Sequence, residues 1–347
     1  MKYHFSPAGG WMNDPNGLIE YKGQFHIFYQ HNPYDTKWGP MHWGHAVSRD
    51  FVNWEELSIA LRPDEEYEDD GGCFSGSAIE KDGRLYLFYT SVSKKYGQAQ
   101  SVAFSDDGNH FEKYAGNPVI KGFPNGFATG EFRDPKVFRY DGEYRMIVGT
   151  VFEGRGRIVM YKSADLLDWK FYGVLYEAED YENCIECPDL FPLGDKWVLM
   201  YSRIGCENSH VVFMTGGFNG NSFTPESTKN IEFGPQFYAP QTFETADGRR
   251  ILIGWFYDWN REVPAGSISA GALTIPREVT LDADGRTLRI YPVREAANLL
   301  EECLLPREFE ETVRAGLGRT ESVEALCDGD GVELFVNKGE LNFSFYR

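Results

Sequence analysis

Three acidic side chains occupy the same position of a repeated sequence pattern. Segments in which a polar turn with glycine precedes an apolar strand recur at intervals of about 50 to 60 residues. Their glycines are Gly23, Gly83, Gly142, Gly194 and Gly248. Eight or nine residues before these glycines stand Asp14, Ser75, Asp134, Glu186 and Pro240. If the repeats surround one axis, the three acids meet in one small space.

Carboxyl groups gathered in this way are suited to acid–base and nucleophilic chemistry. Like charges brought together raise at least one pKa, and a fold keeps such a cluster mainly where the acids have work to do. In glycoside cleavage one carboxylic acid protonates the leaving oxygen, while a second carboxylate attacks the anomeric carbon or activates water. Taken singly, each acid also fits a plain structural role, as a turn residue, a salt-bridged strand end or a solvated strand edge.

The elements that position these acids are predicted to be short strands. Apolar residues alternate with polar ones, and β-branched and aromatic residues are frequent, which excludes a helical repeat. A second signature recurs, with Ser, an Asp two residues on and an aromatic residue six residues on, in SRDFVNW (48–54), SDDGNHF (105–111) and SADLLDW (163–169). Repeats of this length indicate a β-propeller. We therefore predict an all-β fold, with a five-bladed propeller over residues 1–294.

Composition limits the partners. The formal net charge of -19 over 347 residues argues against nucleic acid and anionic membranes, which need a basic surface. The first residues, MKYHFSPAGG, carry no apolar signal segment, and no apolar run is long enough to span a bilayer. We expect a cytoplasmic protein whose six cysteines are reduced thiols. Aromatic residues make up 16% of the chain, and most of these rings are expected in the core; an excess of rings is typical of proteins that stack them on sugars, but composition alone does not show such a function.

Eight motifs together resemble glycoside hydrolase family 32, the family of invertases, sucrose-6-phosphate hydrolases, inulinases and levanases. They are WMNDPNG, FYQHNP, WGHAVS, FSGSA, FRDPKVF, ECPDLF, FYAPQTF and IPREV, in the order of the family, over about residues 3 to 296. The resemblance implies a five-bladed propeller followed by a β-sandwich. It also implies hydrolysis of a terminal β-D-fructofuranosyl bond with retention of configuration. The implied partner is a small carbohydrate substrate.

The resemblance also implies roles for single residues. Asp14 is expected to be the nucleophile, Glu186 the general acid/base and Asp134 a stabiliser of the transition state, with Arg133 holding one of the other acids in place. Apart from the resemblance, Cys187 directly follows Glu186, and two interpretations of it are open: a thiol that tunes this acid, or a small buried residue. The expected substrate-binding residues are Asn13, Gln30, Trp38, Phe74, Ser75, Arg133 and Trp255. We expect neither a metal nor a cofactor, because hydrolysis of an acetal needs none.

The C-terminal region departs from the family. Residues 295–347 are predicted to hold a linker and a shortened β-sandwich remnant, a small hairpin patch packed on the propeller, whose exposed edges favour a homo-oligomer. Three alternatives remain open at this stage. The substrate can be sucrose, its 6-phosphate or a fructan; a sugar can replace water as acceptor, which makes the protein a fructosyltransferase; or the propeller binds sugar without catalysis.

Overall fold

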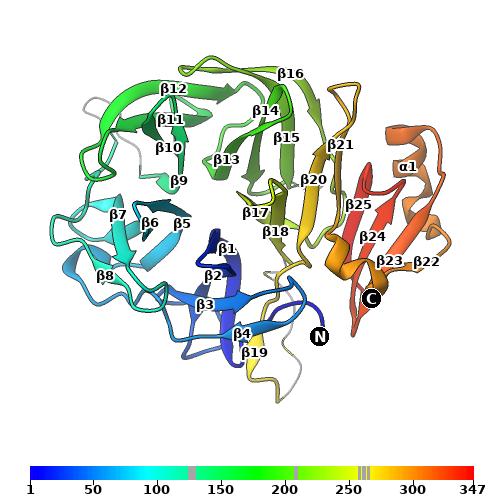
Figure 1. The fold of residues 1–347 in the computed structure, drawn as a ribbon, viewed down its shortest axis with the longest axis horizontal. Helices are drawn as coiled ribbons and strands as arrows, with labels where there is room; N and C mark the ends of the chain where they lie inside the picture. The colour runs from blue at the N-terminus through cyan, green and yellow to red at the C-terminus, as the bar shows by residue number, and fades with distance from the viewer. Residues whose placement is uncertain (124–129, 207–209, 257–258, 260–262, 264–265) are drawn as a thin grey trace.

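The computed structural model describes residues 1–123, 130–206, 210–256, 259, 263 and 266–347. Over these ranges the strands form six sheets, so the all-β prediction is confirmed. Five sheets follow one another in chain order around a common axis, and the sixth lies outside this ring beside β20 and β21 (Figure 1). Among the described residues, no helix has the length and apolar character that crossing a bilayer requires.

The first three sheets comprise the strands up to residue 178. The first, in the order β19-β1-β2-β3-β4, contains β1 (Gly10–Tyr21), β2 (Gln24–Asn32), β3 (His42–Ser48), β4 (Trp54–Glu56) and β19 (Ser269–Ala270). The second contains β5 (Gly72–Lys81), β6 (Arg84–Ser93), β7 (Gly97–Ser105) and β8 (Glu112–Lys113). The third contains β9 (Phe132–Tyr140), β10 (Glu143–Phe152), β11 (Arg155–Ser163) and β12 (Lys170–Ala178).

The remaining sheets and the helices follow. The fourth sheet contains β13 (Ile185–Leu193), β14 (Lys196–Arg203), β15 (Val211–Phe218) and β16 (Phe223–Lys229), and the fifth β17 (Tyr238–Glu244), β18 (Arg250–Trp255), β20 (Arg277–Leu281) and β21 (Leu288–Pro292). The sixth contains β22 (Glu301–Glu302), β23 (Val323–Asp328), β24 (Gly331–Val336) and β25 (Leu341–Tyr346). The helices are the 3₁₀ turns η1 (Glu66–Glu68), η2 (Arg294–Leu299) and η3 (Arg307–Phe309), and α1 (Glu310–Leu317).

The glycines of the repeat close the turns between the first two strands of each ring sheet. In the first turn Lys22 and Gly23 have φ of 50° and 75°, and Asp82 and Gly83 repeat this with 54° and 82°. Two consecutive residues with positive φ define the tight hairpin turn whose twist matches that of paired strands, and glycine adopts this conformation without a steric penalty. The fifth turn is longer, since β17 ends at Glu244 and β18 begins at Arg250.

The Ser/Asp/aromatic signature forms the turn after the third strand. Ser48 Oγ accepts a hydrogen bond from the N–H of Phe51 at 3.0 Å, and Asp50 Oδ1 accepts one from the N–H of Asn53 at 2.8 Å. The same pair of bonds recurs at Ser105 and Asp107, and at Ser163 and Asp165. Short polar side chains replace the missing backbone partners of the turn, which explains why the signature repeats.

The inner strands are those nearest the common axis, β1, β5, β9, β13 and β17 (Figure 1). Each of them is irregular at or beside the repeat position that holds Asp14 in the first sheet. The pairing register shifts between Met12 and Pro15 in β1, between Phe74 and Gly76 in β5, and opposite Ile147 and Gly149 in β9. The same happens in β13 between Glu186 and Asp189, and in β17 between Tyr238 and Gln241. A β-bulge turns a side chain away from the regular alternation of the strand. The five bulges therefore aim one position of every sheet at the common axis.

The ring is closed by contacts between neighbouring inner strands. β1 contacts β5, β5 contacts β9, β9 contacts β13, β13 contacts β17, and β17 contacts β1. In addition, β19 pairs in parallel with the start of β1, with Gly10 opposite Ser269. Apolar clusters fill the spaces between adjacent sheets, for example Leu190 and Met160 between the third and fourth. Burial of these faces stabilises the arrangement and holds the inner strands at fixed distances.

The sixth sheet differs from the expected hairpin patch. It has four strands, and the segment between its strands β22 and β23 contains α1. Acidic residues begin this helix, Gly318 ends it with φ of 67°, and the N–H of Gly318 donates to the carbonyl of Arg314 at 3.1 Å, as at many helix C-termini. The buried side of α1 is Val313, which packs in one cluster with Val336 and Phe343 of the sheet.

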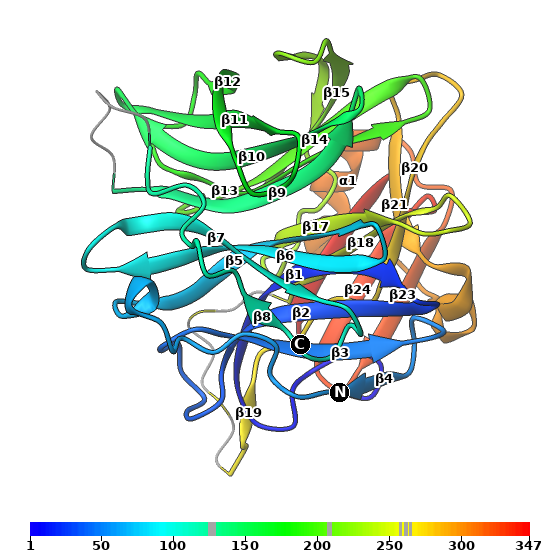
Figure 2. The same ribbon diagram turned by 60° about the vertical axis from the view of Figure 1, so that its left-hand side comes forward.

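A buried ionic network ties this sheet to the ring and to the first residues of the chain. Arg277 of β20, fully buried, donates to Glu333 at 2.6 and 2.8 Å and to Glu232 at 2.7 Å. The other oxygen of Glu333 lies 2.8 Å from Nε2 of His4, and the backbone N–H of His4 donates to Asp328 at 2.9 Å. The two ends of the chain accordingly lie close together beside β23 and β24 (Figure 2).

We expect Arg277→Met to destabilise the protein by about 3 to 5 kcal/mol, because it removes the guanidinium partner of the buried Glu232 and leaves the buried Glu333 to the imidazole of His4. Urea unfolding at pH 7, followed by tryptophan fluorescence, measures this change. Arg294→Met is the matched control, since Arg294 is 69% exposed and its ion pair with Asp247 is worth little. A loss no larger than that of the control contradicts the role given to the buried network.

Candidate active site

The bulges of the inner strands bring the three acids into one cavity. Asp14 of β1, Asp134 of β9 and Glu186 of β13 line it together. The other described lining residues are Asn13, Gln30, Trp38, Phe74, Ser75, Gln98, Glu131, Arg133, Ile204, Tyr238 and Trp259. The convergence expected from the repeat is therefore present, and the acids face one another across the axis.

Asp14 is held by short polar contacts. Ser75, at the same repeat position in the second sheet, donates its hydroxyl to Asp14 Oδ2 at 2.7 Å. The thiol of Cys187 lies 3.7 Å from the same oxygen. Asn13, the preceding residue, accepts a hydrogen bond from the indole N–H of Trp11 at 2.8 Å, which fixes its amide beside Asp14. These contacts hold the carboxyl group while leaving it partly exposed to the cavity.

Glu186 is held by a guanidinium and a phenol. Arg133 donates to Glu186 Oε1 from Nε at 3.0 Å and from Nη2 at 2.8 Å. The hydroxyl of Tyr238 donates to the other oxygen, Oε2. Arg133 was predicted to hold another acid in place, and the acid that it contacts is Glu186. Because charged hydrogen bonds are strong and directional, the carboxyl group of Glu186 has a fixed orientation.

Asp134 is the most buried acid of the three, with 5% exposure. Its Oδ2 accepts a hydrogen bond from the backbone N–H of Cys187 at 2.8 Å, and the Cys187 thiol lies 3.6 Å from this oxygen. Asp134 and Cys187 have φ of 65° and 46°, a conformation that costs energy in residues other than glycine. The backbone is therefore strained at Asp134 in β9 and next to Glu186 in β13. The thiol that one interpretation assigned to tuning Glu186 contacts the other two acids instead.

Burial and mutual repulsion determine the protonation of the cluster. Burial raises the pKa of Asp14, the charge of Glu186 raises it further, and hydrogen bonds from Ser75 and Asn13 oppose the rise. Burial also raises the pKa of Asp134 to about 7, against the attraction of Arg133. Burial keeps Cys187 as a neutral thiol by raising its pKa. Near neutral pH the cluster therefore holds protons that isolated carboxyl groups lose.

We expect Asp134→Asn to stabilise the folded protein at neutral and alkaline pH. A carboxyl group whose folded pKa is about 7 rather than 3.8 makes the folded state less stable as pH rises between these values. The neutral amide of Asn does not ionise, so the variant avoids this decrease in the free energy of unfolding, which amounts to roughly 2 to 4 kcal/mol above pH 7. Its amide oxygen still accepts the hydrogen bond from the N–H of Cys187. Thermal unfolding at pH 8 and at pH 4 measures the difference. An equal stability gain at both pH values, or a loss at pH 8, contradicts the assignment.

Most of the predicted substrate-binding residues line the same cavity. Gln30 donates to the carbonyl of Cys73 at 2.8 Å, which leaves its amide oxygen directed elsewhere. Trp38 is 47% exposed, and its ring meets Phe74 edge-on with 6.0 Å between the centroids. Asn13, Ser75 and Arg133 line the cavity as described above. The cavity thus combines carboxyl groups, amides and an aromatic wall.

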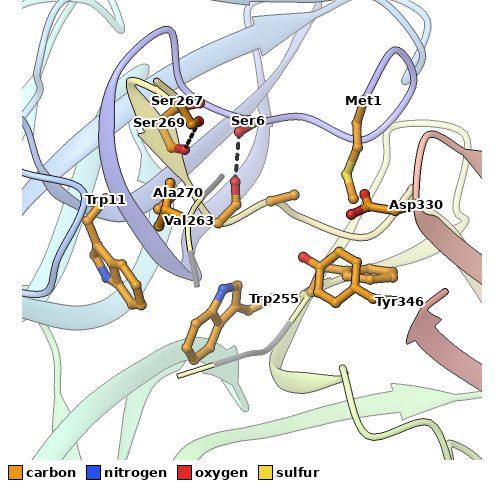
Figure 3. Close-up of a pocket in the computed structure, with 13 residues that line it drawn as sticks. Met1, Ser6, Trp11, Trp255, Val263, Ser267, Ser269, Ala270, Asp330 and Tyr346 are labelled. Carbon is orange, nitrogen blue, oxygen red and sulfur yellow. Dashed lines mark hydrogen bonds between the residues drawn. The ribbon is translucent and has the colours of Figure 1, made fainter. Parts of the chain in front are cut away.

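Trp255 is the exception among the predicted binding residues. It is 1% exposed and does not line the cavity of the acids. Trp11 and Trp259 pack against it, with centroid distances of 6.0 and 5.1 Å. Together with Trp11 it lines a second cavity, whose other side is formed by Tyr346 (Figure 3). Trp255 therefore lies behind the site, and Trp259 takes the position at the cavity.

Sequence reasoning missed several residues of the cavity. Tyr238 stands two residues before Pro240, the fifth position of the repeat, and this register was the signal that could have found it. Gln98, Glu131, Ile204 and Trp259 lie in segments outside the repeat position, and no sequence pattern marks them. Among the described residues, no cluster of His, Cys, Asp and Glu side chains is arranged to hold a metal ion.

The chain is similar to known proteins. A model of the glycosyl hydrolases family 32 N-terminal domain matches residues 4–292. A sucrose-6-phosphate hydrolase of Zymomonas mobilis is 38% identical over 321 residues, which cover 84% of this chain and 62% of that protein. The chain thus spans less than two thirds of that relative's length. A sucrose-6-phosphate hydrolase of Bacillus subtilis is 38% identical over 373 residues, covering 99% of this chain and 77% of that protein.

A solved structure is also similar. The family 32 β-fructofuranosidase of Bombyx mori superposes with a TM-score of 0.86 at 31% identity, over 99% of this chain and 88% of that one. A mutant of the same protein, in complex with sucrose, has the same TM-score and identity. The fold of this chain therefore agrees with that of the Bombyx mori protein.

Proposed function

Because the chain belongs to glycoside hydrolase family 32, we propose that it hydrolyses the terminal β-D-fructofuranosyl bond of sucrose or of short fructo-oligosaccharides. The observation that carries the proposal is the meeting of Asp14, Asp134 and Glu186 in one cavity, with Glu186 held by Arg133 and Asp14 held by Ser75. The sucrose bound to the Bombyx mori protein supports the class of substrate.

In the first step the carboxylate of Asp14 attacks C2 of the fructosyl unit. The bond between C2 and the glycosidic oxygen breaks, and Glu186 gives its proton to that oxygen, so that the remaining sugar leaves as a neutral alcohol. The product is a fructosyl ester on Asp14. Positive charge develops on the ring during this step, and the buried carboxyl group of Asp134 stabilises it while binding ring hydroxyls.

In the second step Glu186, now a carboxylate, removes a proton from water. The water oxygen bonds to C2, the ester bond to Asp14 breaks, and fructose leaves with its original configuration. Asn13, Gln30 and Ser75 bind sugar hydroxyls, and Trp38 with Phe74 forms the apolar wall. We assign Trp255 a supporting place behind Trp11 and Trp259.

The same proposal covers the domain organisation. The five ring sheets are the blades of a five-bladed β-propeller over residues 1–294, and residues 295–347 form a linker and a shortened β-sandwich remnant. We propose a cytoplasmic location. We also propose a homo-oligomer formed through the edge of the sixth sheet at β22, because the other edge, β25, already bonds to residues 231–236.

Incubation with sucrose, sucrose 6-phosphate, 1-kestose, inulin and levan, followed by separation of the released sugars, tests the proposal. We expect sucrose to yield glucose and fructose in equal amounts. Glucose in excess over fructose, together with longer oligosaccharides, indicates a fructosyltransferase instead. A protein that releases no sugar from any of the five, while binding them, is a non-catalytic sugar-binding propeller.

A further inference from the structure

We infer that the cavity selects uncharged sugars, so that the substrate is sucrose or a neutral fructo-oligosaccharide and a phosphate group on the leaving sugar is rejected. This inference rests on the proposed function and goes beyond it, because the hydrolysis mechanism is the same for both classes of substrate. What distinguishes the two classes is the charge at the side of the cavity that receives the leaving sugar.

Among the charged side chains of the described lining, carboxyl groups outnumber cationic groups. Asp14, Glu131, Asp134 and Glu186 are acidic, and Arg133 is the one cationic side chain among the described lining residues. A phosphate monoester carries a charge of about -1.5 to -2 at pH 7. Even when the inner acids share a proton, this lining repels such a group more than it attracts it.

The guanidinium of Arg133 is already engaged. Nε and Nη2 donate to Glu186, while Nη1 is paired with Glu131 and lies 3.3 Å from Oε1 of Gln98. A phosphate group that bound Arg133 has to displace Glu131 or take the guanidinium away from Glu186. If the phosphate takes the guanidinium away from Glu186, the proton donor loses the hydrogen bonds that orient it, and turnover falls as well.

Glu131 lies on the side of the leaving sugar. Glu186 delivers its proton to the glycosidic oxygen, so the residues that continue outward from Glu186 border the leaving group. Arg133 is 12% exposed and Glu131 is 46% exposed, which makes Glu131 the outer member of this chain of contacts. An anionic leaving sugar therefore approaches a carboxylate at the rim.

The remainder of the rim favours a neutral ring. Trp38 and Trp259 line the cavity with 47% and 46% exposure, and aromatic faces of this kind stack on the apolar faces of sugars. Lys94 and Lys95 follow the end of β6 but do not line the cavity, and the ammonium of Lys95 lies over the ring of Tyr96 at 4.8 Å. The described rim therefore pairs exposed aromatic surface with negative charge.

The test compares kcat/KM for sucrose and for sucrose 6-phosphate with the whole chain. We expect sucrose to be preferred by roughly tenfold or more at low salt, the size of a poorly screened charge repulsion. Raising NaCl from about 0.01 M to about 1 M shortens the screening length from about 30 Å to about 3 Å and should narrow the preference several-fold. An equal or higher kcat/KM for the phosphate overturns the inference while leaving the proposed hydrolysis intact. Absence of hydrolysis with both of these substrates and with 1-kestose overturns both the inference and the proposed function.

Substitution of Glu131 tests whether its carboxylate causes the preference for sucrose over sucrose 6-phosphate. Glu131→Gln should shift the ratio of the two kcat/KM values toward the phosphate by about 3- to 10-fold, and Glu131→Lys should shift it further. Glu143→Gln is the matched control, since Glu143 also pairs with the arginine two residues on, at 3.2 Å from Arg145, has 49% exposure and does not line the cavity. A ratio that stays unchanged in both Glu131 variants overturns the inference.

Discussion

Replacement of Asp14 by Asn is expected to lower kcat for sucrose by about 10⁴-fold or more. An amide oxygen is a poor nucleophile toward C2, and the variant also loses the negative charge that stabilises the developing cation. The fold should be kept. In the wild type the hydroxyl of Ser75 donates to Asp14 Oδ2 at 2.7 Å, and in the variant the amide oxygen of Asn can accept the same hydrogen bond. Loss of a buried carboxyl group with a raised pKa even favours the folded state above that pKa.

Initial rates of glucose release and thermal unfolding of the same preparation measure both effects. Asp50→Asn serves as the control, because Asp50 lies in a turn of the same first sheet and makes only local contacts. We expect this control to retain kcat within about twofold. An Asp14→Asn variant that is folded and turns over within tenfold of the wild type is incompatible with Asp14 as the nucleophile.

Replacement of Glu186 by Gln is expected to have the second largest effect, a loss of about 10³-fold in kcat for sucrose. The glutamine cannot protonate the leaving glucose, whose alkoxide is a poor leaving group. A β-D-fructofuranosyl fluoride needs no such proton, so the first step with this substrate should be affected far less. The second step still lacks its base, and an initial burst of fluoride release followed by slow turnover is therefore expected.

The comparison of the two substrates separates a catalytic role from a structural one. A general disturbance of the site lowers the rate of the first step with both substrates to the same degree, whereas loss of the proton donor spares the first step with the fluoride, seen as the burst. Glu182→Gln is the control, since Glu182 is exposed just before β13 and does not line the cavity. Equal losses in the rate of the first step, measured before the second step limits turnover, contradict Glu186 as the acid.

The convergence of the acids was predictable because it depends on periodicity. Each turn glycine fixes the register of a hairpin, and an equal distance back along the chain reaches the same height in every sheet. Asp14, Asp134 and Glu186 could therefore be grouped without any knowledge of their surroundings. The Ser/Asp turns were recognisable for the same reason, since their hydrogen bonds lie within six residues of sequence.

Contacts made across the ring were not predictable. The bulges arise where an inner strand slips against its partner, and this slip depends on both strands together. Tyr238 reaches Glu186 from a different sheet, and Glu131 meets Arg133 at a rim where no pattern repeats. Trp255 was expected in the cavity, but Trp11 and Trp259 pack against it and it lines a different cavity.

The C-terminal region shows a further limit of sequence reasoning. The segment around α1 has no strand alternation, and its single helix is fixed by Val313 packing on the sixth sheet and by Gly318 at its end. Arg277 and Glu333 are 56 residues apart, yet they form the ion pair that joins this sheet to the ring. Such long-range partners become visible only when the two surfaces are in contact.

The most direct test of the double displacement is the configuration of the glycoside formed when methanol competes with water. Methanol attacks the fructosyl ester on Asp14 from the face that the leaving sugar occupied, and the methyl glycoside does not interconvert between its anomers. NMR of the product from sucrose in aqueous methanol should therefore show methyl β-D-fructofuranoside alone. Formation of the α-anomer means a single displacement, with no ester on Asp14, and contradicts the account.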